Sequence, residues 1–122
     1  MTHTPDPTRT VNLTDTTAVH DLERNYRAAF LRYLPSQDEA ALDAGYQIGR
    51  AAVADGLSIL ELAHVHHQLF LEVLTDTPPN DLARVAAAAS NFFLQTLATY
   101  DIAQRAYHAQ ASTETPPGQP HP

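Results

Sequence analysis

The chain contains no cysteine, no lysine and no tryptophan. Without cysteine, disulfide bonds and thiolate chemistry are excluded. Its seven basic residues are all arginine, and the formal net charge is −7 at pH 7. A compact acidic domain repels phosphate backbones and anionic lipid headgroups. We therefore expect no nucleic-acid partner and no role at a membrane surface.

Long apolar runs are also missing. A bilayer-spanning helix needs about 20 mostly apolar residues, and a signal peptide needs an apolar core near its start. Neither pattern occurs in the 122 residues, so we expect a cytoplasmic protein. A chain of this length forms one domain with a hydrophobic core of its own.

The clearest helix signal is the stretch Ser58 to Leu74, SILELAHVHHQLFLEVL. Ser58 and Glu61 form a capping box, in which each side chain bonds the backbone amide of the other residue. The apolar arc of this stretch covers roughly half the helix circumference or more, which is wider than one helix contact needs. We therefore expect a central helix that is buried on two sides.

Three further helices flank this stretch. Apolar residues at three- and four-residue steps predict a first helix from about Thr16 to Leu34, ended by Pro35. The capping pattern SQDE at Ser36 opens a second helix, and Gly56 is placed as its left-handed cap. A fourth and longer helix runs from about 81 to 109.

These elements predict an all-α fold, a compact antiparallel four-helix bundle with a long fourth helix. The short link at Gly56 makes the second and third helices antiparallel neighbours. We expect a flexible arm at 1–13, the bundle at 14–110 and a disordered tail at 111–122, because both ends are poor in apolar residues.

The second helix carries a ridge of small residues at four-residue spacing. Each glycine inside a helix costs on the order of 1 kcal/mol relative to alanine, so another backbone should approach closely there. Tight packing within one bundle and a dimer seam are both open. More helix surface is apolar than four helices can cover, which favours association. The predicted dimer or partner interface is Ala41, Gly45, Ile48, Gly49, Ala52 and Ile102.

The only histidine cluster lies in the third helix. Glu61 and His64 share a helix face with the Glu-x-x-His spacing of di-metal bundles, but the second motif that such sites require is absent. His66 falls in the apolar arc, where a neutral imidazole bonded to another helix is expected. His64 and His67 are candidate pH-sensitive or partner contacts.

Nucleophilic catalysis has no support in the sequence, because there is neither a cysteine nor a Gly-x-Ser-x-Gly turn. The acidic pair Asp38 and Glu39 lies in a first helical turn, where it complements the helix dipole. The five tyrosines lie at apolar-stripe positions and are expected in the core. We expect no enzyme activity.

Four stretches resemble a known family in their order along the chain. They are FLRYL after Tyr26, AGYQIGR ending at Arg50, GLSILELAHVHH, and SNFFLQTLATYDIAQRAYH. Together they resemble the N-terminal domain of RsbU-type serine phosphatases, which regulate sigma factors by partner switching. Family members look similar at Arg50, His66 and Tyr100.

The resemblance implies a small four-helix domain that dimerises and receives a switch kinase of the RsbT type. No metal-dependent phosphatase sequence follows the helical part, so we expect a non-catalytic regulatory domain without cofactor. Its expected partner in bacterial stress and sigma-factor signalling is an RsbT-like kinase or a separately encoded phosphatase. A helical metal- or small-ligand-binding bundle that uses Glu61, His64 and His67 is the alternative.

Overall fold

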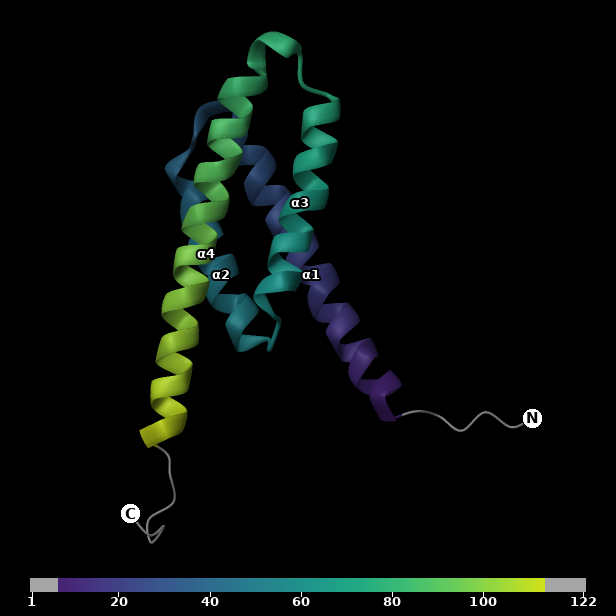
Figure 1. Ribbon diagram of the computed structural model, residues 1–122, viewed down its shortest axis with the longest axis vertical. Coiled ribbons are helices and arrows are strands. Elements are labelled where there is room, and N and C mark those ends of the chain that lie inside the picture. Colours follow the sequence, from purple (N-terminus) through teal and green to yellow (C-terminus); the bar gives the residue numbers. More distant parts are fainter. Residues whose placement is uncertain (1–6, 114–122) are drawn as a thin grey trace, which may run out of the picture.

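The computed structural model describes the backbone of residues 7–113 and the side chains of residues 16–110. Within this part of the chain all long elements are helices: α1 (Pro7–Ser36), α2 (Glu39–Ala54), α3 (Ile59–Thr75) and α4 (Leu82–Thr113), with a short 3₁₀ turn, η1 (Pro79–Asp81). Consecutive helices run up and down, so neighbours along the chain are antiparallel (Figure 1). The predicted all-α four-helix fold is confirmed.

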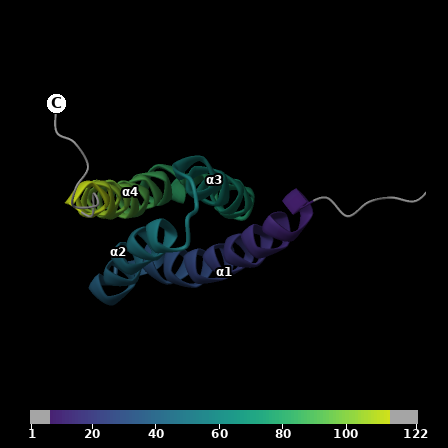
Figure 2. The ribbon, with the colours of Figure 1, turned by 90° about the horizontal axis from the view of Figure 1, so that it is seen from below.

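The helices form two layers, with α1 and α2 in one layer and α3 and α4 in the other (Figure 2). The most extensive contact joins α2 to α4, and α1 packs against all three other helices. The helices α2 and α3 lie diagonally and do not pack side by side. The prediction that they are neighbours was wrong, because α2 fits closely against α4 instead.

Aromatic rings fill the centre between α1 and α4. Tyr26, Phe30, Tyr33 and Phe92 are each at most 2 % exposed. Tyr26 meets Phe92 edge to face, with ring centroids 5.2 Å apart, a geometry that aromatic pairs favour. None of the described helices is long and apolar enough to cross a membrane.

The outer ends of α1 and α4 differ from the predicted bounds. The helical backbone of α1 begins at Pro7, where a proline suits the first position of a helix because its missing amide hydrogen is not needed there. The helix α4 continues to Thr113, since no glycine or proline interrupts it. Residues 1–6 of the expected arm and 114–122 of the expected tail lie outside the described residues.

The junction of α1 and α2 also differs from the prediction. Pro35 lies inside the last turn of α1, where the proline removes only one ladder bond. The helix ends at Ser36, and the next residue, Gln37, has a φ of +53° and an amide that donates to the Tyr33 carbonyl at 2.7 Å. Asp38, not Ser36, caps α2, because its side chain accepts from the amide of Ala40 at 3.0 Å.

The junction of α2 and α3 was predicted correctly. Gly56 has a φ of +74°, which a glycine adopts at little cost. The amide of Leu57 donates to the Ala52 carbonyl at 2.9 Å, which completes a Schellman motif and buries Leu57. The capping box of Ser58 and Glu61 is present in both directions.

Candidate functional site

The small-residue ridge of α2 faces α4 of the same chain. A Cβ atom added at Gly45 would lie 3.0 Å from the ring of Phe92. At Gly49 an added Cβ would collide with the hydroxyl of Thr99 and with the carbonyl oxygen of Thr96. The helix α4 therefore approaches so closely that it leaves little or no room for a side chain at these two positions.

This contact changes the predicted interface. Of its six residues, five are buried within the chain: Ala41, Gly45, Ile48, Gly49 and Ala52. Packing inside the bundle explains both glycines, so the ridge itself does not form an exposed seam. Ile102 is the member on the surface, with 66 % of its area exposed.

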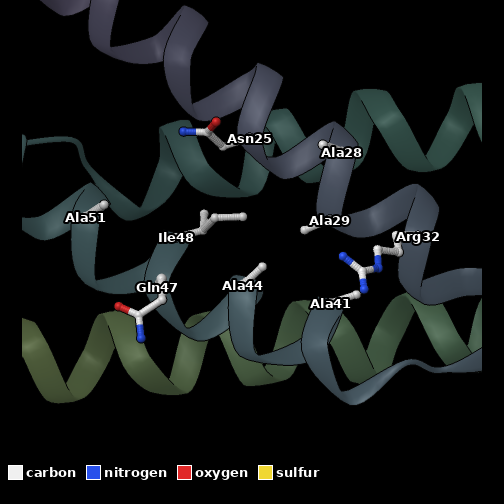
Figure 3. A pocket seen from close by; sticks show the side chains of 9 residues that line it. All are labelled: Asn25, Ala28, Ala29, Arg32, Ala41, Ala44, Gln47, Ile48 and Ala51. Atoms are coloured by element: carbon white, nitrogen blue, oxygen red, sulfur yellow. The ribbon is translucent and has the colours of Figure 1, made fainter.

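A groove between α1 and α2 lies beside the ridge (Figure 3). It has a volume of about 480 Å³, and its lining is mostly apolar. Asn25, Arg32 and Gln47 supply the polar groups, and Arg32 donates through Nε to Asp38 at 2.8 Å. The remaining lining residues are Ala28, Ala29, Ala41, Ala44, Ile48 and Ala51. Ala41 and Ile48 of the predicted interface line this groove, but Ala41 is completely buried and Ile48 is only 7 % exposed.

A second groove of about 660 Å³ lies between the last turns of α2 and the C-terminal half of α4. Ile102, Arg50 and Tyr107 line it. Tyr107 was expected in the core but is 60 % exposed, because α4 extends beyond the end of α2. The sequence did not predict that Arg50, Ile102 and Tyr107 line one groove. The apolar Ile102, which lies outside the main apolar stripe of its helix, was the one indication of a contact surface there.

His66 is a core residue, as predicted. Its Nδ1 lies 2.7 Å from the hydroxyl of Tyr26, and its ring stacks on Phe93 with centroids 4.0 Å apart. Burial, with a smaller contribution from His67, lowers the pKa of His66 to about 4. Burial also raises the pKa of Tyr26, so the pair is neutral at pH 7 and joins α1 to α3.

Hydroxyl groups of other tyrosines join the helices as well. Tyr100 donates to the carbonyl oxygen of Leu57 at 2.8 Å, which ties α4 to the link between α2 and α3. Its pKa is raised by burial and by the nearby carboxylate of Glu61. Tyr46 donates to Gln95 at 2.9 Å, and Tyr33 accepts from Asn91. These contacts hold the bundle together and leave no free hydroxyl for chemistry among them.

The predicted metal ligands do not converge. Glu61 accepts the amide of its capping serine at 3.0 Å, so its carboxylate is turned toward the start of α3. His64 and His67 are exposed on the outer side of the same helix. Among the described residues no group of three or more histidine, cysteine, aspartate or glutamate side chains could hold a metal ion. The alternative site within one chain is therefore not formed there.

The fold and these features define the class of the protein: a small all-α domain of four helices in two layers, with open grooves on both sides of α2. Residues 24–103 match the model of the family described as the phosphoserine phosphatase RsbU, N-terminal domain, and the chain belongs to this family. The resemblance noted in the sequence is thus confirmed. Searches of curated proteins and of solved structures gave no match.

This family is the regulatory N-terminal domain of phosphatases in sigma-factor partner switching, and it is distinct from their catalytic domain. The three positions to which the sequence resemblance pointed have different roles in the structure. Arg50 is exposed in the second groove, whereas His66 and Tyr100 are buried, and they bond Tyr26 of α1 and the link between α2 and α3. Of the three, only Arg50 is available to a partner.

Proposed function

We propose that the chain is a non-catalytic regulatory domain that binds a switch kinase of the RsbT type in sigma-factor partner switching, and that it acts as a homodimer in the cytoplasm. The observation that carries this proposal is the extent of the family match. It begins in α1 and ends in α4, so it includes the whole of α2 and α3 and the packed core. The match therefore concerns the folded unit and not a single motif.

The grooves on the two sides of α2 supply the surface for this function. Each offers an apolar floor with an arginine at its edge, Arg32 in one and Arg50 in the other. Arg32 is paired with Asp38, whereas Arg50 lies beside the exposed Ile102 and Tyr107. An apolar centre surrounded by polar groups is the usual composition of a protein interface. We assign partner binding to these two grooves, which α2 forms with α1 on one side and with α4 on the other.

A separately encoded phosphatase is the other expected partner, and it would use the same surface. Both partners make the chain an adaptor that acts through binding. A metal site that uses Glu61 together with His64 and His67 of one chain is not favoured, because Glu61 is engaged in the helix cap.

The test is capture from the lysate of the source organism with untagged, immobilised protein in EDTA, followed by mass spectrometry. We expect recovery of a small ATP-binding switch kinase or of a phosphatase of the same pathway. Ile102→Asp should abolish this recovery. Leu31→Asp on α1 is the matched control, because Leu31 is also a large aliphatic side chain on the surface, with 47 % of its area exposed. Recovery of the domain alone would contradict the proposal.

A further inference from the structure

The outward face of α3 carries a stripe of four side chains at steps of four, three and four residues: Leu60, His64, His67 and Leu71. All four are exposed, and Leu60 reaches 77 %. They lie opposite the buried face of α3, which consists of Leu62, Val65, His66 and Leu69. This arrangement corrects the prediction of a helix buried on two sides, because α1 and α4 cover only one side of α3.

The outward stripe has no charged residue, although the exposed face of a surface helix is normally charged. The two carboxylates of α3 point elsewhere. Glu61 accepts the amide of Ser58, and Glu72 pairs with Arg27 of α1 at 3.1 Å. Two leucines and two imidazoles are thus exposed, and Leu60 and His64 also line a groove beside Val19 and Glu23 of α1.

The stripe is symmetric about its own centre. Its order is Leu, His, His, Leu, and the midpoint lies between Val65 and His66. A two-fold axis through this midpoint would place Leu60 against the partner's Leu71 and His64 against the partner's His67. A two-fold interface uses the same patch on both subunits, so a self-complementary stripe suits an antiparallel pair of α3 helices. The alternating four- and three-residue steps are those of helices that pack side by side.

The two histidines can chelate one ion. Residues three apart on a helix are neighbours, with Cβ atoms about 5–6 Å apart, so both rings can reach a zinc ion at about 2.0–2.1 Å. Two imidazoles fill half of a tetrahedral site, and the described residues contain no group of three ligands. The two-fold axis supplies the missing pair from the second chain.

We propose that a divalent transition-metal ion of the zinc class, bound by His64 and His67 of two chains, joins two copies of the protein antiparallel through α3. The stripe from Leu60 to Leu71 is about 16 Å long. A contact of this length buries less than the roughly 1,200 Å² of a stable interface, so the ion is required for association through α3. This proposal is independent of the proposed function.

The experiment is sedimentation velocity of untagged protein at pH 7.5, in EDTA and with added Zn²⁺, together with calorimetric titration of zinc. We expect at least a doubling of the weight-average mass with zinc, reversal by EDTA, and one zinc ion per two chains. His64→Ala and His67→Ala should each abolish the zinc effect. The matched controls His20→Ala and His108→Ala change exposed histidines of α1 and α4 and should retain it.

Several results would overturn the proposal. These are zinc binding without a change of mass, a stoichiometry of one ion per chain, or loss of the effect in the two control variants. Leu60→Ala should weaken the zinc-dependent association about a hundredfold, because the substitution removes one leucine from each chain of the two-fold seam and each loss corresponds to about tenfold. An unchanged association would place the ion elsewhere than at the α3 seam. Partner capture in EDTA is unaffected by these outcomes, so a failure of either proposal can be recognised separately.

Discussion

The helices α2 and α3 are similar in length but are held in the bundle in different ways. The helix α2 approaches α4 so closely that two glycines replace side chains, and its contact has no room for larger groups. The helix α3 is attached through the stack of His66 on Phe93, the buried bond between His66 and Tyr26, and the exposed ion pair of Glu72 with Arg27. The stability of the α2 contact should therefore depend on side-chain volume at the two glycines, and the stability of the α3 contact on the protonation state of His66.

The largest expected effect is at Gly49. Gly49→Leu would drive a side chain into the hydroxyl of Thr99 and the backbone of Thr96. Overpacking of a tight core costs about 1–3 kcal/mol or more, and here the obstacle includes backbone, so we expect loss of folding. Circular dichroism, recorded at room temperature and during thermal melting, measures this loss of folding. Gly45→Ala is the graded comparison, since its Cβ would meet the edge of the Phe92 ring at 3.0 Å. Equal stability of both variants and the parent chain would contradict the close α2–α4 contact.

Acid should weaken the attachment of α3 to the bundle. The pKa of His66 is about 4 in the folded state against 6.5 for an ordinary histidine, so the unfolded chain binds the proton more readily. The contribution of neutral His66 is complete above pH 6.5 and falls as the pH is lowered toward 4. The loss is roughly 3 kcal/mol over this interval, at about 1.4 kcal/mol per pKa unit.

Urea unfolding between pH 7 and pH 4 tests this sign. Surface carboxylates contribute to the same profile, so His66→Leu serves as the reference that lacks the imidazole. The difference between the unfolding free energies of the parent chain and of this variant should decrease as the pH is lowered. A parent chain as stable at pH 4 as at pH 7, relative to this variant, would contradict a buried neutral His66.

A smaller effect is expected at Tyr26. Tyr26→Phe keeps the ring, which meets Phe30 and Phe92, and removes the hydroxyl that bonds Nδ1 of His66. A buried group that loses its partner costs about 1–3 kcal/mol. Chemical denaturation should detect this loss at pH 7. Tyr107→Phe is the control, because the hydroxyl of an exposed side chain should contribute little.

The smallest effect is expected at the ion pair between α1 and α3. Arg27 and Glu72 approach to 3.1 Å, but both side chains are exposed to more than two fifths of their area. Their hydrogen bonds raise the pKa of Arg27. Exposed ion pairs contribute little to stability because water and salt screen them, so Glu72→Gln should leave the melting temperature nearly unchanged at physiological salt. A loss as large as that of Tyr26→Phe would contradict the minor role assigned to this ion pair.

Much of the local structure was predictable. The cap at Gly56, the capping box at Ser58 and the neutral role of His66 were all read from residues close in sequence or from helix periodicity. The cap at Asp38 was not, because the left-handed Gln37 moved the boundary by two residues. A left-handed glutamine gives no sequence signal comparable to that of a glycine.

The sequence by itself determined the four helices and most of their ends, because capping and periodicity act within a few residues of the chain. It also predicted that the glycine ridge requires a close neighbour, since glycine in a helix is costly. Only the tertiary structure decided that this neighbour is α4 of the same chain, that α2 and α3 lie apart, and that Leu60, His64, His67 and Leu71 face outward. The physical reason is that several helix faces are apolar, and the choice among them depends on which surfaces fit closely in three dimensions.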